Sequence, residues 1–438
     1  MRPSSARERI RDTERHGAEP VSERPLLTVV ESAPTPPSAK PSGRSIHGLD
    51  WFVFFVADIQ TGFGPFVAAY LTAQHWTQID IGLVLSVAGL VALAGQIPGG
   101  AIVDAARSER LVAGFAIIMI SIAALSYAAW PIFPVVLGAA ILHAAASCVL
   151  GPAIAAISLG LVGHTAIGER LGRNARFASI GNGIAAAAMG ASGYLFSTRA
   201  VFFVTAVLLV PALFALRLIS PKEVDPERAH GGMPPAGADK SVCELPNLLH
   251  KRPLFIFGGC MMLFHLANAA MLPLMASMVT TRSSSWAPVL IAACIVVPQV
   301  VVALLSPTVG RKARQWGRRP LLLIGFASLP IRGILFATVT DPSVLVVVQV
   351  LDGITAAVLG VMVPLTIADL TRGTGRFNIA QGIVGTMVGI GAALSTSVGG
   401  YATDHLGSTF AFLGLASIGV AGFMAVLALM PETRPAEA

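Results

Sequence analysis

Long apolar runs recur along this chain from residue 49 to its end, and they constrain its fold more than any other feature. Crossing about 30 Å of hydrocarbon takes roughly 20 residues of α-helix, and each run reaches that length. Inside hydrocarbon every backbone polar group needs an internal partner, and these runs are too long for barrel strands, so they must be helices. The sequence therefore predicts an all-α membrane protein with twelve transmembrane helices. The predicted spans are residues 50–73, 79–103, 111–130, 133–158, 176–197, 200–219, 253–279, 286–308, 320–339, 343–367, 378–402 and 408–430.

The net charge alone does not distinguish a membrane protein from a nucleic-acid-binding protein, but the amino-acid composition does. The net charge is +7, and the stretch GRKARQWGRR at residues 310–319 concentrates five cations, a pattern also typical of nucleic-acid binding. However, only 12% of the residues are charged and 54% are hydrophobic, with a mean hydropathy of +0.74. A soluble domain carries about 25% charged residues. We therefore expect the lipid bilayer as a partner and no nucleic acid.

Polar segments divide the chain into domains. Residues 1–46 are rich in proline and mixed charge, have no apolar core like that of a signal peptide, and are expected to form a disordered cytoplasmic tail. Residues 220–252 separate two groups of six spans and are expected to be a cytoplasmic linker. The predicted bundles are residues 47–219 and 253–430, and residues 431–438 are a second cytoplasmic tail.

The distribution of arginines predicts the orientation. With the N-terminus in the cytoplasm, the inward connections hold Arg107 and Arg110, then Arg170, Arg173 and Arg176, then the cluster at residues 310–319, and finally Arg372 and Arg376. The outward connections hold only Arg199 and Arg282. This asymmetry follows the positive-inside rule, so both termini are expected in the cytoplasm of a multi-pass protein of the cell membrane, a bacterial inner membrane being our expectation.

The two halves of the chain repeat at an offset of 210 residues. The connection after the second span, GAIVDAARSER, aligns with residues 310–320, which places Gly100 on Gly310, Asp104 on Arg314 and Arg107 on Gly317. Pro65 in the first span pairs with Pro273 in the seventh at nearly the same offset. The chain is therefore expected to hold two pseudo-symmetric six-helix bundles.

These connections resemble the signature of the major facilitator superfamily, Gly-x-x-x-Asp-x-x-Gly followed by two basic residues, which lies between the second and third helices and is echoed between the eighth and ninth. The resemblance covers the chain apart from its first 46 residues. It implies alternating access by two rocking bundles and a gating role for these loops on the cytoplasmic side. The residues concerned are Gly100, Asp104, Arg107 and Arg110 in the first copy, and Gly310, Arg314, Gly317, Arg318 and Arg319 in the second.

Polar residues inside the spans are the candidate site residues, because a charge near the bilayer centre costs about 2.5–3.5 kcal/mol. Asp58 and His265 are candidate proton carriers, since a partly desolvated carboxylate or an imidazole can titrate near neutral pH. Arg332 is expected to be a structural charge, at a depth that Asp352 on the next helix can match. Candidates for contact with substrate are Gln60, His143, Asn268 and Asp352.

The sequence lacks the motifs of several enzyme and metal-site classes, and this limits the functions to consider. There is no phosphate-cradling loop, HExxH or Gly-x-Ser-x-Gly motif, and the four cysteines have no metal-ligand spacing, so we expect neither an enzyme nor a cofactor or metal. The main interpretation is a monomeric secondary active transporter of a small organic solute, proton-coupled and possibly exporting. A uniporter or importer of a nutrient or siderophore-like solute is the alternative within transport. A membrane receptor or integral membrane enzyme on the same fold is the alternative of another class.

Overall fold

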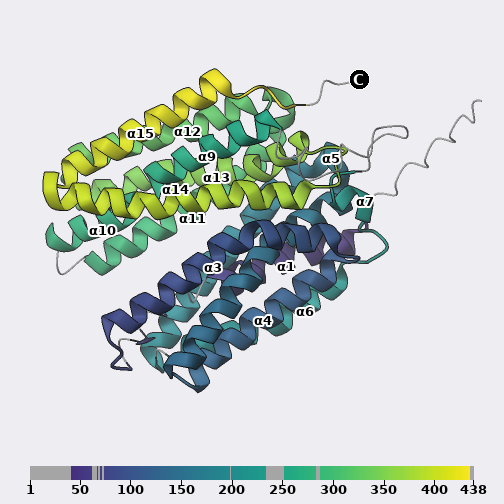
Figure 1. Cartoon of the computed structure of the whole chain (residues 1–438), viewed down its shortest axis with the longest axis horizontal. Helices are drawn as coiled ribbons and strands as arrows, with labels where there is room; N and C mark the ends of the chain where they lie inside the picture. The colour runs from purple at the N-terminus through teal and green to yellow at the C-terminus, as the bar shows by residue number, and fades with distance from the viewer. Residues whose placement is uncertain are drawn as a thin grey trace, which may run out of the picture. The chain divides into compact units, whose positions relative to one another are not determined.

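The computed structural model describes residues 41–61, 67, 70–71, 74–197, 199–232, 251–282 and 287–434, and within these ranges all regular structure is helical. Figure 1 shows the helices in two groups, purple to teal for the first half of the chain and green to yellow for the second. The first half contains α1 (Gly43–Thr61), α3 (Gln78–Ala105), α4 (Glu109–Ala129), α5 (Phe133–Leu195) and α6 (Ala200–Leu218). The short α7 (Pro226–Ala229) follows. The second half contains α9 (Arg252–Asn268), α10 (Met271–Arg282), α11 (Ala287–Trp316), α12 (Arg319–Thr338), α13 (Pro342–Leu370), α14 (Phe377–Leu406) and α15 (Ser408–Leu429).

Ten helices in the described part of the chain are long and apolar enough to cross a membrane. One of these, α5, contains both the fourth and the fifth predicted spans. It passes through Gly163, whose φ of 67° and ψ of 178° are not helical and lie where glycine alone is comfortable, so α5 is two helices in sequence. Residues 50–61 of the first predicted span lie in α1. Each of the twelve predicted spans thus falls, wholly or in part, on a described helix.

The start of the fifth helix differs from the prediction. The sequence places it at residue 176, because residues 164–175 include two arginines and read as a connection, whereas the structure begins the helix directly after Gly163. The reason is a buried carboxylate on another helix. Asp50 of α1 accepts hydrogen bonds from Arg170 and Arg173, which neutralises the polar turn and lets it pack inside the bundle.

Each half has its own apolar core, which explains why the chain folds as two bundles. Residues between Leu49 and Ala229 form one core, with Phe52, Tyr70 and Phe202 fully buried in it. A second core runs from Leu254 to Met430 and takes in a few α5 residues. Other large apolar side chains, such as Phe115 of α4, are exposed, as expected for helices that face lipid.

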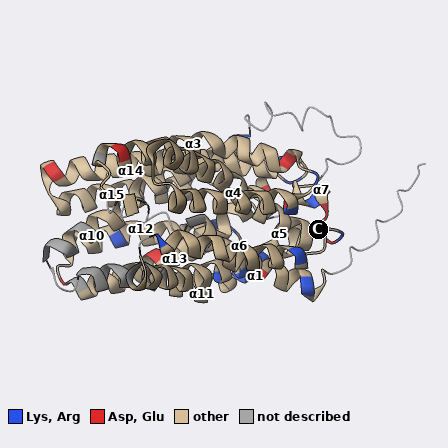
Figure 2. Cartoon of the chain, turned by 90° about the horizontal axis from the view of Figure 1, so that it is seen from below, with Lys and Arg blue, Asp and Glu red and all other residues tan. Residues whose placement is uncertain are grey.

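Lysine and arginine gather at one end of the helices, the end that holds α7 (Figure 2). We call this the basic end, defined by Arg107, residues 169–176 and residues 310–319. The predicted linker, residues 220–252, begins there with α7, and its residues 233–250 lie outside the described part of the chain, as do residues 1–40 of the predicted tail. The helix α1 begins at Gly43, four residues before the predicted boundary of the first bundle.

Candidate functional site

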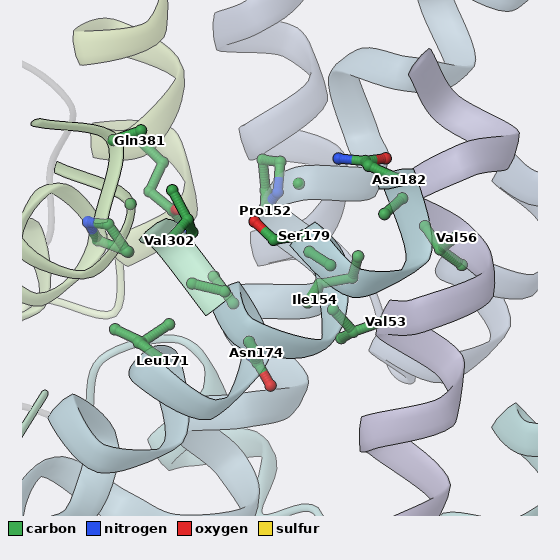
Figure 3. Close-up of a pocket in the computed structure, with 18 of the residues that line it drawn as sticks. Val53, Val56, Pro152, Ile154, Leu171, Asn174, Ser179, Asn182, Val302 and Gln381 are labelled. Atoms are coloured by element: carbon green, nitrogen blue, oxygen red, sulfur yellow. The ribbon is translucent and has the colours of Figure 1, made fainter. Parts of the chain in front are cut away.

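A cavity of about 550 Å³ lies between the two halves, and both contribute to its walls. Three helices of the first half, α1, α3 and α5, meet three helices of the second, α11, α13 and α14, around it (Figure 3). Two of the lining residues are prolines inside helices, Pro152 of α5 and Pro364 of α13. Proline frees backbone groups in a membrane helix and is tolerated where neighbours or a cavity can satisfy them.

The cavity has a mixed lining of apolar and neutral polar side chains. Apolar groups such as Val53, Val56 and Val302 face six amides and hydroxyls, and no charged side chain is among the lining residues that the structure describes. Such a surface can hold an organic molecule through hydrogen bonds and apolar contact. The polar lining residues are Gln96, Asn174, Ser179, Asn182, Gln299 and Gln381.

These polar groups differ in how much hydrogen-bonding capacity they have free. Asn174 is held in place, because it accepts from Arg170 at 2.8 Å and donates to Ser158 at 2.8 Å. Asn182 is different, since its buried Oδ1 has no hydrogen-bond partner among the described residues. Leaving such an atom unpaired costs about 1–3 kcal/mol, which a polar ligand in the cavity would recover. Asn182 is therefore the clearest ligand-binding group in the lining.

At the basic end the halves are in close contact through two equivalent helix pairs. In the first pair, α3 meets α14: a Cβ added to Gly100 would overlap the carbonyl of Asn378, and one added to Gly382 would overlap that of Gln96. Small residues allow this approach of two backbones in a membrane bundle.

The second helix pair repeats the first at an offset of 210 residues. Here α11 meets α5, with Gly310 against Gly168 and Gly172 against the carbonyl of Ser306. Each of these four positions is 210 residues from its counterpart in the other pair, so a pseudo-twofold axis relates the two contacts. The basic end of the cavity is shut by this symmetric packing.

The architecture and the central cavity can now be compared with known proteins. The profile of the Major Facilitator Superfamily matches two overlapping stretches, residues 51–329 and 257–438. The chain belongs to this superfamily. It is therefore a multi-pass membrane transporter, as its sequence predicts, and not an enzyme.

Relatives in the superfamily share most of its length. Two curated proteins of Mycobacterium tuberculosis, from strains CDC 1551 / Oshkosh and ATCC 25618 / H37Rv, bear the name uncharacterized MFS-type transporter. Each is 39% identical to this chain over 395 residues, which is 89% of this chain and 94% of the relative.

Solved structures of the superfamily share the fold. The proton:xylose symporter XylE, bound to 6-bromo-6-deoxy-D-glucose, has a TM-score of 0.65 at 16% identity, covering 89% of this chain and 96% of its own. FucP in the outward conformation has a TM-score of 0.69 at 14% identity, covering 88% and 97%. At these identities the likeness concerns the fold alone.

The first copy of the superfamily motif in this transporter connects the two halves through Asp104. Its carboxylate accepts from the backbone N–H of Ile379 at 2.8 Å and of Asn378 at 3.2 Å, and from the Asn378 amide at 2.8 Å. These groups begin α14, so Asp104 caps that helix and meets the positive end of its dipole. Arg107 is exposed, and Arg110 donates to the carbonyl of Leu216 at 3.0 Å within its own half.

The second copy of the motif connects the halves through Arg314, which pairs with Glu169 at 2.5 Å. The other basic residues of this copy turn toward their own half. Arg318 is buried and donates to Asp369 of α13 at 2.7 Å, and Arg319 donates its backbone N–H to Glu432 at 3.1 Å. Gly317 adopts a φ of 90°, in the left-handed region, where a side chain would also meet Glu432.

Three of the predicted intramembrane residues come together in the second half. Arg332 of α12 forms an ion pair with Asp352 of α13 and donates to the Asn268 side chain of α9. The arginine is buried, whereas the side chain of Asp352 is 28% exposed. Neither Asn268 nor Asp352 is among the lining residues of the central cavity, because both turn toward Arg332.

The other predicted residues inside the spans are His265, His143, Asp58 and Gln60. His265 of α9 is half-buried and packs edge-on against Phe264, with ring centroids 5.3 Å apart, and His143 of α5 is half-buried. Neither lines the central cavity. Asp58 and Gln60 lie in the last turn of α1, and their side chains are outside the described part of the structure.

One buried polar network was not predicted from the sequence. Asp50 is fully buried, and Arg170 is 4% exposed and donates to it at 2.6 Å. Arg173 also pairs with Asp50, and Arg170 reaches Asn174 in the cavity wall. In the sequence, Asp50 stands next to Trp51 where the first apolar run begins, so it reads as the polar edge of a span. This network supports the cavity wall from the basic end.

The start of the linker bridges the two halves at the same end. Asp225 donates its backbone N–H to Gly160 at 3.2 Å, and His230 lies 3.1 Å from the Glu109 carboxylate, both in the first half. From the second half, Phe377 donates to the carbonyl of His230 at 3.2 Å. This segment, which lies outside the membrane spans, therefore contacts both halves and holds them together at the basic end.

Proposed function

We propose that this transporter moves a small organic solute by alternating access, with the central cavity as the binding site. The observation that carries this proposal is the cavity itself, which takes its walls from both halves and presents the unpaired amide oxygen of Asn182 beside apolar surface. Because both bundles line it, a rocking motion of one against the other would open it to each side in turn. The neutral lining favours a solute held by hydrogen bonds over one held by ion pairs.

We further propose that the basic end faces the cytoplasm. Support comes from the arginines gathered there, as the positive-inside rule requires. Single cysteines introduced at the exposed positions Gln315 and His75 test this in intact cells. The first is expected to react with an impermeant reagent only after the membrane is opened, and the second without opening. The reverse result would overturn the orientation.

Proton coupling is proposed for Asp58 and His265, on the sequence argument that each is a titratable group well inside its span, the first and the seventh. Export is the direction we favour, and uptake or uniport of a nutrient or siderophore-like solute is the competing mode. A cavity with a neutral, partly apolar lining is compatible with both directions of transport. A receptor on this fold would bind solute without moving it across the membrane, so a measurement of flux distinguishes a receptor from a transporter.

The experiment has two steps. Solutes are first screened for those that raise the melting temperature of the purified transporter, and each hit is then tested for counterflow in liposomes. Asn182→Ala and Gln299→Ala are expected to weaken binding of a hit several-fold, because one neutral hydrogen bond is worth about 0.5–1.5 kcal/mol. Gln349→Ala is the matched control, since Gln349 is a buried amide of α13 that does not line the cavity. Equal effects at all three positions would place the binding site elsewhere.

A further inference from the structure

A second cavity, of about 610 Å³, lies at the basic end between α1, α5 and α11. Its lining holds four arginines, Arg170, Arg173 and Arg176 from α5 and Arg311 from α11, against a single carboxylate, Glu169. We call this cavity the arginine pocket. Neither the transport cavity nor the motif contacts account for so many cations in one place.

The arginine pocket has more positive charge than its own carboxylates neutralise. Asp50, fully buried behind the pocket, is shared by Arg170 and Arg173. Glu169 is already paired with Arg314, which lies outside the lining. Like charges packed together repel one another, and a bound anion relieves that repulsion.

Two arginines have donors left for such an anion. Arg176 donates its Nε to the carbonyl of Ala303 at 2.9 Å, and Arg311 donates one Nη to Thr308 at 3.2 Å. Neither has a carboxylate partner among the described residues. A guanidinium presents several N–H donors in a plane and binds phosphate oxygens in pairs, so two of them on facing helices suit a phosphate group.

The surroundings of the arginine pocket are apolar and exposed. Trp51 of α1 is 47% exposed and packs against Phe177, a lining residue, with ring centroids 6.1 Å apart. Ile180, also in the lining, and Leu304 are exposed on the same two helices that carry Arg176 and Arg311. Tryptophan beside lipid-facing aliphatic groups is typical of the membrane interface. An amphipathic ligand bound here would place its polar group among the arginines and its apolar part against the lipid-facing side chains.

We propose that the arginine pocket binds a phosphate group, presented by the headgroup of an anionic lipid. Basic pockets between membrane helices at the basic side are suited to such headgroups, and the adjoining apolar surface accommodates the acyl chains. Because Arg173 and Arg176 belong to the first half and Arg311 to the second, the phosphate would bridge the halves beside the Gly168–Gly310 contact. The bound lipid would stabilise the closed basic end.

The test measures lipid binding and not transport, so it is independent of the solute. The purified, full-length transporter is titrated with phosphatidylglycerol or with phosphatidylcholine, and bound lipid is counted by native mass spectrometry. Phosphatidylglycerol is expected to bind at least about tenfold more tightly. The double variant Arg176→Gln/Arg311→Gln is expected to abolish that preference. The control Arg107→Gln/Lys312→Gln removes the same charge from the basic end outside the pocket and is expected to keep it.

Two further arms make the result decisive. The variant Arg176→Lys/Arg311→Lys retains charge but not paired donors, and melting of each variant without lipid shows whether it is folded. Soluble glycerol phosphate identifies the source: failure to compete supports a lipid headgroup, whereas full competition supports the phosphate site with a free phosphate as its ligand. If phosphatidylglycerol and phosphatidylcholine bind equally to the wild type, or if the control loses as much as the double variant, the proposal is overturned.

Discussion

Gly310 of α11 lies directly against Gly168 of α5, so closely that a Cβ on Gly168 would stand 3.0 Å from the Gly310 carbonyl oxygen, and a Cβ on Gly310 would overlap the Gly168 carbonyl. The same contact recurs 210 residues away, between Gly100 of α3 and Asn378 of α14. Helix backbones meet here without intervening side chains. The basic end is therefore held shut by packing that leaves no room for even one methyl group.

Gly310→Ala is expected to part α11 from α5 at the basic end. Overpacking of this kind costs about 1–3 kcal/mol, more than the roughly 1 kcal/mol that alanine adds to a helix interior. The melting temperature should fall, and a cysteine placed near the contact should become more reactive. Gly414→Ala is the control, because nothing lies within 4 Å of a Cβ there and the helix gain acts alone. Matching melting curves for the two variants would show that the contact is looser than described.

Asp50→Asn is expected to be strongly destabilising. It leaves Arg170 buried and charged without its carboxylate, and breaking a buried pair in this way costs about 3–5 kcal/mol. Adding Arg170→Gln should restore much of the folded yield, since Arg173 is 43% exposed and can reach solvent. The measurement is monodisperse yield and melting temperature, with the exposed Asp404→Asn as control. If the double variant instead shows the sum of the losses in yield and melting temperature of the two single variants, the Asp50–Arg170 pair is not what stabilises this region.

Asp352→Asn is expected to lower folded yield because Arg332 then keeps an uncompensated charge inside the bundle. The double variant Asp352→Asn/Arg332→Gln should recover part of that yield. Asn268→Ala removes a neutral partner of the same arginine and should cost less, about 1–2 kcal/mol. If the double variant only adds two losses, Asp352 acts outside the pair, and substrate contact becomes the better explanation for its exposed side chain.

The number of spans and the repeat can be predicted from the sequence, because hydrophobic length and the 210-residue offset are properties of the chain itself. It also matched Arg332 with Asp352, since consecutive helices of similar length bring equal depths together. Depth does not give the direction in which a side chain points around its helix. For that reason the sequence predicts Asn268 in the cavity, whereas the structure places it against Arg332, and nothing in the sequence distinguishes the cavity amides Asn182 and Gln299 from other polar residues.

Asp58→Asn is expected to uncouple transport from protons. The substitution mimics the neutral carboxyl group, so solute binding and exchange should persist while movement driven by a pH gradient is lost. The assay compares wild type and variant in liposomes with an imposed pH difference, using a solute identified by the stability screen. His265→Gln is tested beside it. Undiminished pH-driven flux in Asp58→Asn would move the coupling role to His265.

The His230–Glu109 contact makes the stability of the basic end dependent on pH. Contact with the Glu109 carboxylate raises the pKa of His230 above the usual 6.5, burial opposes this, and attraction to Glu109 and Asp104 adds to it. Because the pKa in the folded protein is higher than in the unfolded chain, the stabilisation is complete below about pH 6.5 and is lost as the pH rises through the folded-state value.

We expect the charged form of His230 to raise the melting temperature, and to do so only at low pH. Wild type should exceed His230→Gln by more at about pH 6 than at about pH 9, because this stabilisation is lost as the pH rises through the raised pKa of His230. His405→Gln, at the far end of α14 and exposed, supplies the control for losing a histidine. Glu109→Gln should remove the same pH-dependent difference, because it takes away the partner that favours the imidazolium. A wild-type advantage of equal size at both pH values would mean that the His230 side chain stabilises this end through contacts that do not depend on its charge.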